Sequence, residues 1–131
     1  MLKYFFASIV ALCMSSALYA QSPQDTTVYS NPDVQPAFPG GIEKFNKFLA
    51  YRVAYPLADR RNGVQGTVYI SFIVEIDGSL SNIKPVASPS KTLEEESLKA
   101  VKSSPKWMPA AVQGKPVRAS YTIPVVFSLG G

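Results

Sequence analysis

Residues 66–80 read GTVYISFIVEIDGSL, and this stretch decides the fold. Every second residue from Val68 to Ile76 is apolar, whereas the residues between them are mostly polar. Alternation with a period of two is the pattern of a strand that buries one face. Asp77-Gly78 follows directly, and this pair is the short-range signal for a hairpin turn. The sequence therefore predicts a strand over 68–76 that turns back into a second strand over 80–86.

A third strand is predicted over 117–129, where the same alternation returns. Its apolar face comprises Val117, Ala119, Tyr121, Ile123, Val125, Phe127 and Leu129. Proline cannot donate a ladder hydrogen bond, so Pro85 and Pro124 place the second and third strands at the edges of the sheet. The first strand has no proline and can be central. The third strand is expected to be the longer exposed edge, and such an edge is a template for adding another strand.

Two helices are predicted to cover the apolar face of this sheet. Apolar residues recur at helical spacing from Ile42 to Val53, and Tyr55-Pro56 ends that pattern. A further helical turn is expected over 57–61. The Thr92–Glu95 run reads as a capping box that opens the second helix. The predicted fold class is therefore α+β, a three-stranded antiparallel sheet packed on one face by two helices.

The N-terminus has the order of a secretory signal: one charge at Lys3, an apolar run, and small residues before Ala20. We expect residues 1–20 to be a signal peptide cleaved after Ala20, with cleavage after Ala17 as the fallback. Two alternatives stay open, an uncleaved inner-membrane anchor over residues 4–20 and a lipoprotein modified at Cys13. Residues 21–35 are polar and contain proline, which predicts a disordered lead-in to a single domain over 36–131.

The composition excludes most common catalytic sites. The chain contains no histidine, and its one cysteine lies in the expected signal peptide. A mature chain of this kind has no disulfide, no Cys or His metal site and no Cys–His or Ser–His nucleophile pair. The net charge of +4 comes without a basic cluster and does not argue for nucleic acid. We therefore predict no enzyme activity, no metal and no cofactor.

The remaining polar and aromatic features favour structural interpretations. Trp107 is expected to pack in the core. The Glu94–Glu96 run is expected to be a solvated helix start, and Asp77 is expected to shape its turn. The Asp59–Arg61 segment is expected to be an exposed helical turn rather than a docking site for an acidic partner.

Several motifs, in order along residues 36–129, resemble the C-terminal domain of TonB in the form seen in Bacteroidetes-type bacteria. They are residues 36–41 (PAFPGG), Tyr55-Pro56, Gly63–Gly66, the 68–75 strand, Asp77-Gly78, Trp107–Pro109, Gly114–Val117 and Tyr121–Val125. The resemblance implies a periplasmic domain that grips an extended segment of an outer-membrane TonB-dependent receptor by adding it to the last strand.

The resemblance also implies roles for individual residues. Partner binding is expected at Arg52, Tyr55, Pro56, Arg118, Ser120, Thr122, Pro124 and Val126. Structural roles are expected for Gly63, Gly66, Asp77, Gly78, Trp107 and Pro109. Several TonB proteins have a glutamine where Arg52 stands, so this chain departs from their pattern there. TonB proteins transmit energy through a membrane anchor, so a chain without its leader is expected to bind receptors without pulling on them.

A hypothesis of a different class is a self-associating structural or signalling module. The exposed edge of the last strand could pair with its copy in a second chain to form a strand-paired or swapped dimer.

Overall fold

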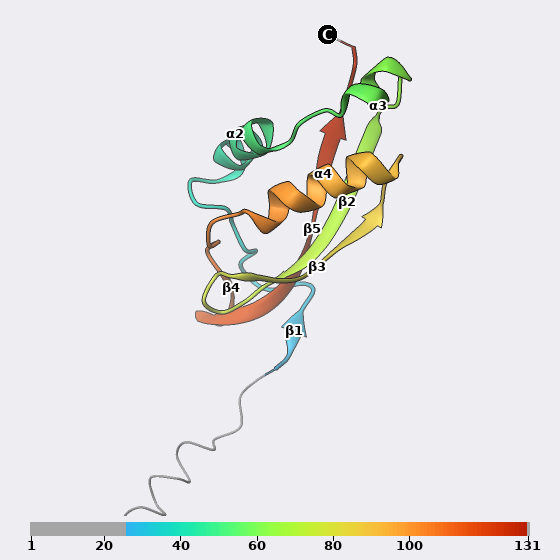
Figure 1. Cartoon of the computed structure of the whole chain (residues 1–131). Coiled ribbons are helices and arrows are strands. Elements are labelled where there is room, and N and C mark those ends of the chain that lie inside the picture. Colours follow the sequence, from blue (N-terminus) through green and yellow to red (C-terminus); the bar gives the residue numbers. More distant parts are fainter. Residues whose placement is uncertain (1–25, 131) are drawn as a thin grey trace, which may run out of the picture.

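The computed structural model describes residues 26–130, in which three helices accompany a curled sheet (Figure 1). The strands are β1 (Val28–Tyr29), β2 (Gly66–Val74), β3 (Leu80–Ala87), β4 (Ala110–Val112) and β5 (Lys115–Phe127). The helices are α2 (Ile42–Arg52), α3 (Leu57–Arg61) and α4 (Lys91–Lys102). The predicted α+β class is confirmed. The expected signal peptide and its cleavage site lie outside the described residues.

The central position of β2 agrees with the sequence prediction. β2 pairs antiparallel with β3 on one side and with β5 on the other, in the sheet order β1-β5-β2-β3. Its continuous register with β5 runs from Gly66 opposite Phe127 to Val74 opposite Ala119. The strand at the far edge is β3, which contains Pro85 as predicted.

Two sequence predictions are wrong. The described residues contain five strands rather than three, and the start of β5 is not a free edge. β4 folds back onto Lys115–Val117 through Gln113 and Gly114, which have φ angles of 51° and 77°. Two positive φ angles are what a tight two-residue hairpin turn requires. On the side away from β2, β1 pairs in parallel with Arg118 and Ala119. Within residues 26–130, the outer edge of β5 is therefore unpaired only from Ser120 onward.

Part of the expected disordered lead-in is ordered, because its backbone finds partners on the β4–β5 hairpin. Val34 exchanges backbone hydrogen bonds of 3.0 Å with Ala111. The Asp33 carboxylate accepts from the backbone nitrogen of Gln113 at 2.8 Å. The polar composition predicted disorder because the segment has few apolar side chains to bury. The segment is ordered by backbone hydrogen bonds, which composition does not reveal.

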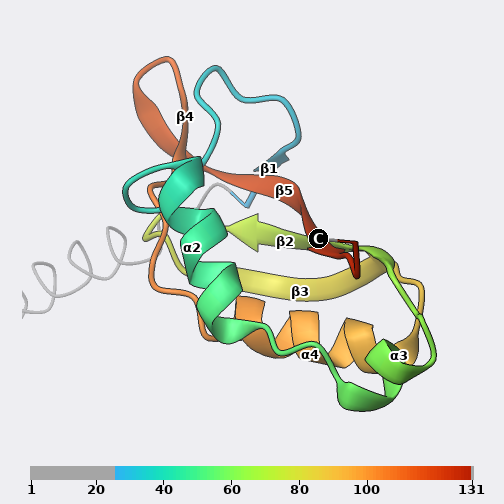
Figure 2. The ribbon, with the colours of Figure 1, turned by 90° about the horizontal axis from the view of Figure 1, so that it is seen from above.

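Both long helices lie on the same face of the sheet (Figure 2). The buried side chains of β2, namely Val68, Ile70, Phe72 and Val74, point to this face. Trp107 packs at the centre of the core, 6% exposed, as predicted. Its ring lies 5.2 to 5.8 Å, centroid to centroid, from the rings of Phe38, Phe45, Phe72 and Tyr121. The aromatic cluster thus joins α2, the sheet and the segment after α4.

The predicted capping box at Thr92 is wrong, because Ser90 caps α4 instead. The Ser90 hydroxyl oxygen accepts from the backbone nitrogen of Leu93 at 3.1 Å. The Thr92 hydroxyl donates to the Asp59 carboxylate on α3. Asp59 is consequently buried, at 7% exposure, which corrects the expectation of an exposed turn at this residue. In the described part of the chain, no helix is long and apolar enough to cross a membrane.

Candidate partner-binding groove

The two edges of the sheet differ in how they are protected. β3 carries an exposed lysine and proline at Lys84 and Pro85, a positive φ of 49° at Asn82, and breaks in its register with β2. Charges, proline and bulges are the devices that stop an edge from pairing with another chain. Over residues 120–127, β5 has Pro124 as its one such device and keeps a continuous register with β2. The β5 edge is therefore the one suited to receive an added strand.

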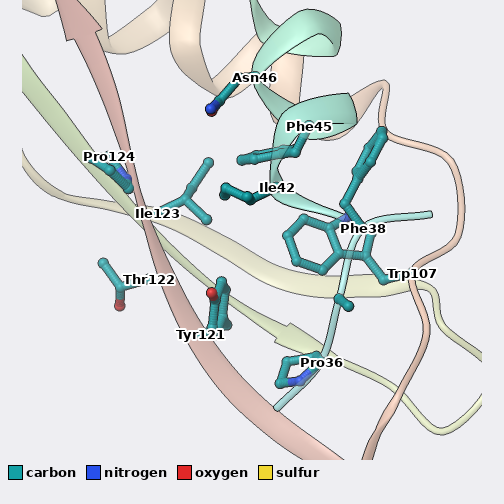
Figure 3. Close-up of a pocket in the computed structure, with 11 residues that line it drawn as sticks. Pro36, Phe38, Ile42, Phe45, Asn46, Trp107, Tyr121, Thr122, Ile123 and Pro124 are labelled. Atoms are coloured by element: carbon teal, nitrogen blue, oxygen red, sulfur yellow. The ribbon is translucent and has the colours of Figure 1, made fainter. Parts of the chain in front are cut away.

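Two cavities lie between α2 and this edge. The first has a volume of about 210 Å³ and lies against Tyr121–Pro124 (Figure 3). The second has a volume of about 400 Å³ and lies against Pro124–Ser128. Asn46 on α2 and Pro124 on β5 line both cavities, so the cavities form one depression along the strand. We call this depression the edge groove.

The walls of the edge groove are mainly apolar and carry no charged side chain. The first cavity is lined mainly by Phe38, Ile42, Phe45, Trp107 and Tyr121. The second is lined mainly by Leu49, Val53, Tyr55, Val125 and Phe127. No lysine, arginine, aspartate or glutamate lines either one. The groove therefore offers apolar contacts to a strand laid beside β5.

Four predicted contact residues occupy the solvent-facing positions of β5. Thr122, Pro124 and Val126 are exposed, and Ser120 is half-buried. Val126 is 69% exposed although it is apolar. The structure thus places these four residues along the unpaired edge, and their contact with a partner stays a prediction.

Tyr55 stands at the end of the groove and has a structural role there. Its hydroxyl donates to the backbone oxygen of Val64, and its ring meets that of Phe127 edge-on at 5.3 Å. Pro56 follows as the residue before α3. Arg52 does not join them, because its guanidinium lies over the Phe48 ring, 5.3 Å from the centroid, and lines neither cavity.

Arg118 on β5 is hydrogen-bonded to the residue that follows β2 and to a residue that precedes β1. Its Nε donates to Glu75 Oε1 at 2.6 Å and its Nη2 donates to Glu75 Oε2 at 3.2 Å. Its Nη1 donates to the backbone oxygen of Thr26 at 2.7 Å, just before β1. The hydrogen bond from Arg118, followed by that from Ser81, lowers the pKa of the Glu75 carboxyl. Each of the three guanidinium nitrogens of Arg118 therefore already donates within the chain, although Arg118 was predicted as a partner contact.

The predicted structural residues lie at turns. Asp77 Oδ1 accepts from the backbone nitrogen and the hydroxyl of Ser79, and these bonds lower the pKa of Asp77. Gly63 follows the end of α3 with a φ of 68°, and Gly66 begins β2 with a φ of 141°. Pro109 directly precedes β4.

Sequence reasoning missed the α2 side of the groove. Asn46 and Ile42 line it, and Ile42 is 67% exposed. The helical spacing had placed Ile42 on the apolar face of this helix, which the structure corrects, and no sequence signal marks Asn46. The described residues contain no group of three or more Cys, Asp or Glu side chains placed to hold a metal ion.

Comparisons with known proteins identify the family of this domain. Residues 51–129 match the model of the C-terminal domain of the Gram-negative bacterial TonB protein. The solution structure of the Helicobacter pylori TonB C-terminal domain, residues 194–285, is 28% identical with a TM-score of 0.51, covering 68% of this chain and 94% of that one. A longer form, residues 179–285, is 27% identical with a TM-score of 0.52, covering 68% and 80%. No curated protein matches. The chain therefore belongs to the TonB C-terminal domain family.

Proposed function

We propose that this protein binds an extended segment of an outer-membrane TonB-dependent receptor as an additional strand on the edge of β5. Membership in the TonB family supports an interaction with such receptors in general and a role that is not enzymatic. The binding mode is β-strand addition, in which main-chain hydrogen bonds provide affinity and side-chain pockets provide selectivity.

The observation that carries this proposal is the unpaired edge from Ser120 to Phe127 beside the edge groove. Eight residues of strand offer about 26 Å of backbone for pairing. The chain itself already uses this edge, since β1 pairs with Arg118 and Ala119 immediately before the unpaired part. An extended backbone is therefore accommodated beside β5 at one end, and a partner would continue the same row.

We propose that the protein works in the periplasm after cleavage at Ala20. The TonB family is associated with the cell envelope, which supports export. The intact mass of the protein from its native host tests this point: the mass of a chain beginning at Gln21 is expected, and a mass that includes residues 1–20 would contradict cleavage.

The binding mode is tested by titrating isotope-labelled full-length protein with peptides from the N-terminal segments of the host's receptors. We expect amide shifts concentrated in Ser120–Phe127. An added strand directs every second one of its backbone N–H groups toward β5. Two peptides are therefore N-methylated, one at the odd-numbered and one at the even-numbered residues. The peptide whose methyl groups face β5 should not bind, and the other should bind normally. The two methylated peptides have the same composition and so control for side-chain effects.

Two results would contradict the proposal. Shifts scattered away from β5 would place the partner elsewhere. Equal losses of affinity for the two N-methylated peptides would mean that the peptide binds without pairing to the strand.

The same free edge supports a second candidate function, self-association through β5. A strand-paired dimer would use the main-chain groups of residues 120–127 in both copies. Sedimentation velocity at several protein concentrations separates the two candidates. If the protein sediments as a monomer at every concentration, self-association is excluded. If it forms a dimer at higher concentration that added peptide does not dissociate, self-association is favoured.

A further inference from the structure

We propose that the edge groove selects receptor segments with an uncharged apolar–polar–apolar pattern at positions i, i+2 and i+4. This selectivity rests on the proposed function, because it assumes a strand laid along β5. It follows from the spacing of the two cavities and from the polar residue that stands between them.

The spacing of the cavities determines which side chains enter them. A strand beside β5 directs every second side chain toward the α2 side, with same-face neighbours about 7 Å apart. The first cavity lies against Tyr121–Pro124 and the second against Pro124–Ser128. Their midpoints are thus roughly three to four residues apart along β5, or about 12 Å. Positions i and i+4, about 13 Å apart, match this spacing, whereas i and i+2 do not.

The side chain at position i+2 meets Asn46. Asn46 lines both cavities and extends from α2 toward β5 (Figure 3). Its side chain is exposed, and among residues 26–130 its amide forms no hydrogen bond. A side-chain amide offers both a donor and an acceptor. A hydroxyl or amide side chain at i+2 can use them, whereas an aliphatic one would cover the Asn46 amide without a partner.

The outer positions exclude charge. Aromatic and aliphatic side chains form most of the walls, and no charged residue lines either cavity. A carboxylate or ammonium group at i or i+4 would lose water without gaining an opposite charge. An aliphatic side chain at the outer position that enters the first cavity would instead cover Ile42, which is 67% exposed in the unbound protein. Both effects favour apolar residues at the two outer positions.

The experiment uses peptides that share one backbone and differ only at i, i+2 and i+4. Their side chains at these positions are Val-Thr-Val, Val-Val-Val, Glu-Thr-Glu and Lys-Thr-Lys. Each is titrated into the full-length protein, the Asn46→Leu variant and the Lys47→Leu variant. Lys47 is exposed on the same helix and lines neither cavity, so it controls for the change in helix composition.

We expect Val-Thr-Val to bind most tightly, and both charged peptides to bind at least about tenfold more weakly. Asn46→Leu should weaken Val-Thr-Val binding by about fivefold, the effect of one lost hydrogen bond. The same variant should reverse the preference, so that Val-Val-Val binds more tightly than Val-Thr-Val. Lys47→Leu should leave the order of the peptides unchanged.

The outcomes separate this inference from the proposed function. Equal binding of charged and apolar peptides, with shifts in Ser120–Phe127, would overturn the selectivity and leave strand addition standing. An Asn46→Leu variant with the unchanged peptide order would overturn the assignment of i+2. Absence of shifts at β5 for every peptide, or its occupation by a second copy, would overturn the proposed function as well.

Discussion

The backbone nitrogen of Trp107 donates to the carbonyl oxygen of Gly78 over 2.8 Å, so the β2–β3 turn is joined to the segment that follows α4. Gly78 is buried, with a φ of 90°. A Cβ atom at this position would lie 2.1 Å from the Trp107 carbonyl oxygen. Glycine is therefore required at this position for two reasons: the backbone has a positive φ angle, and the Trp107 backbone lies where a Cβ atom would be.

Gly78→Ala is expected to destabilise the protein strongly. The Cβ would collide with backbone that cannot move without displacing the Trp107 ring from the core, so a loss of more than about 2 kcal/mol is expected in urea unfolding. Gly114→Ala is the matched control, because Gly114 has a φ of 77° and open space at its Cβ. That variant should lose only about 1 kcal/mol, the conformational part alone. Equal losses would show that the contact with Trp107 has no energetic weight.

The Glu75–Arg118 pair should make stability depend on pH in one direction. The pKa of Glu75 is lowered in the folded protein, chiefly by Arg118, so its contribution is fully present above the ordinary carboxyl pKa. That contribution should disappear as the pH falls through the lowered pKa. The difference in unfolding free energy between the native protein and Glu75→Gln should therefore be largest near neutrality and shrink in acid. A difference that grows in acid would contradict the assignment.

The regular elements could be predicted because their patterns are local. The alternation in β2 and β5 and the helical spacing of α2 follow from which side chains face one core. β1 could not be predicted in this way, since its two residues are held by backbone pairing and by the bond from Arg118 to Thr26. Nothing in the composition of residues 26–35 indicates that pairing.

The cap of α4 and the α2 wall of the groove depend on contacts distant in sequence. Both Ser90 and Thr92 precede a helical pattern and could cap it. Ser90 has the extended backbone of a cap and Thr92 lies inside α4, where its hydroxyl donates to Asp59 on the distant α3. In the same way, Asn46 reads as an ordinary polar residue of an amphipathic helix. Its place in the site follows from where α2 lies beside β5.

Tyr55→Phe should separate a structural role from a binding role. The variant removes the hydrogen bond to the backbone oxygen of Val64 and keeps the edge-on contact with Phe127. Chemical unfolding should show a loss of about 1 kcal/mol. Because the hydroxyl already donates within the chain, peptide affinity should change less than twofold. A large loss of affinity with little loss of stability would instead make the hydroxyl a partner contact.

Asp59→Ala should weaken the junction between α3 and α4. The Asp59 carboxylate is buried and accepts from the Thr92 hydroxyl and, at 3.4 Å, from the Ser90 hydroxyl, at the N-terminal end of α4 where negative charge is favourable. Its removal should cost about 1–3 kcal/mol in urea unfolding, because two hydroxyls lose an acceptor. Asp59→Asn should lose less, since one side-chain oxygen remains. Glu95→Ala, an exposed carboxylate on the first turns of the same helix, should change stability by less than about 0.5 kcal/mol. If the Asp59 and Glu95 variants were equally stable, the buried carboxylate would not be what joins the two helices.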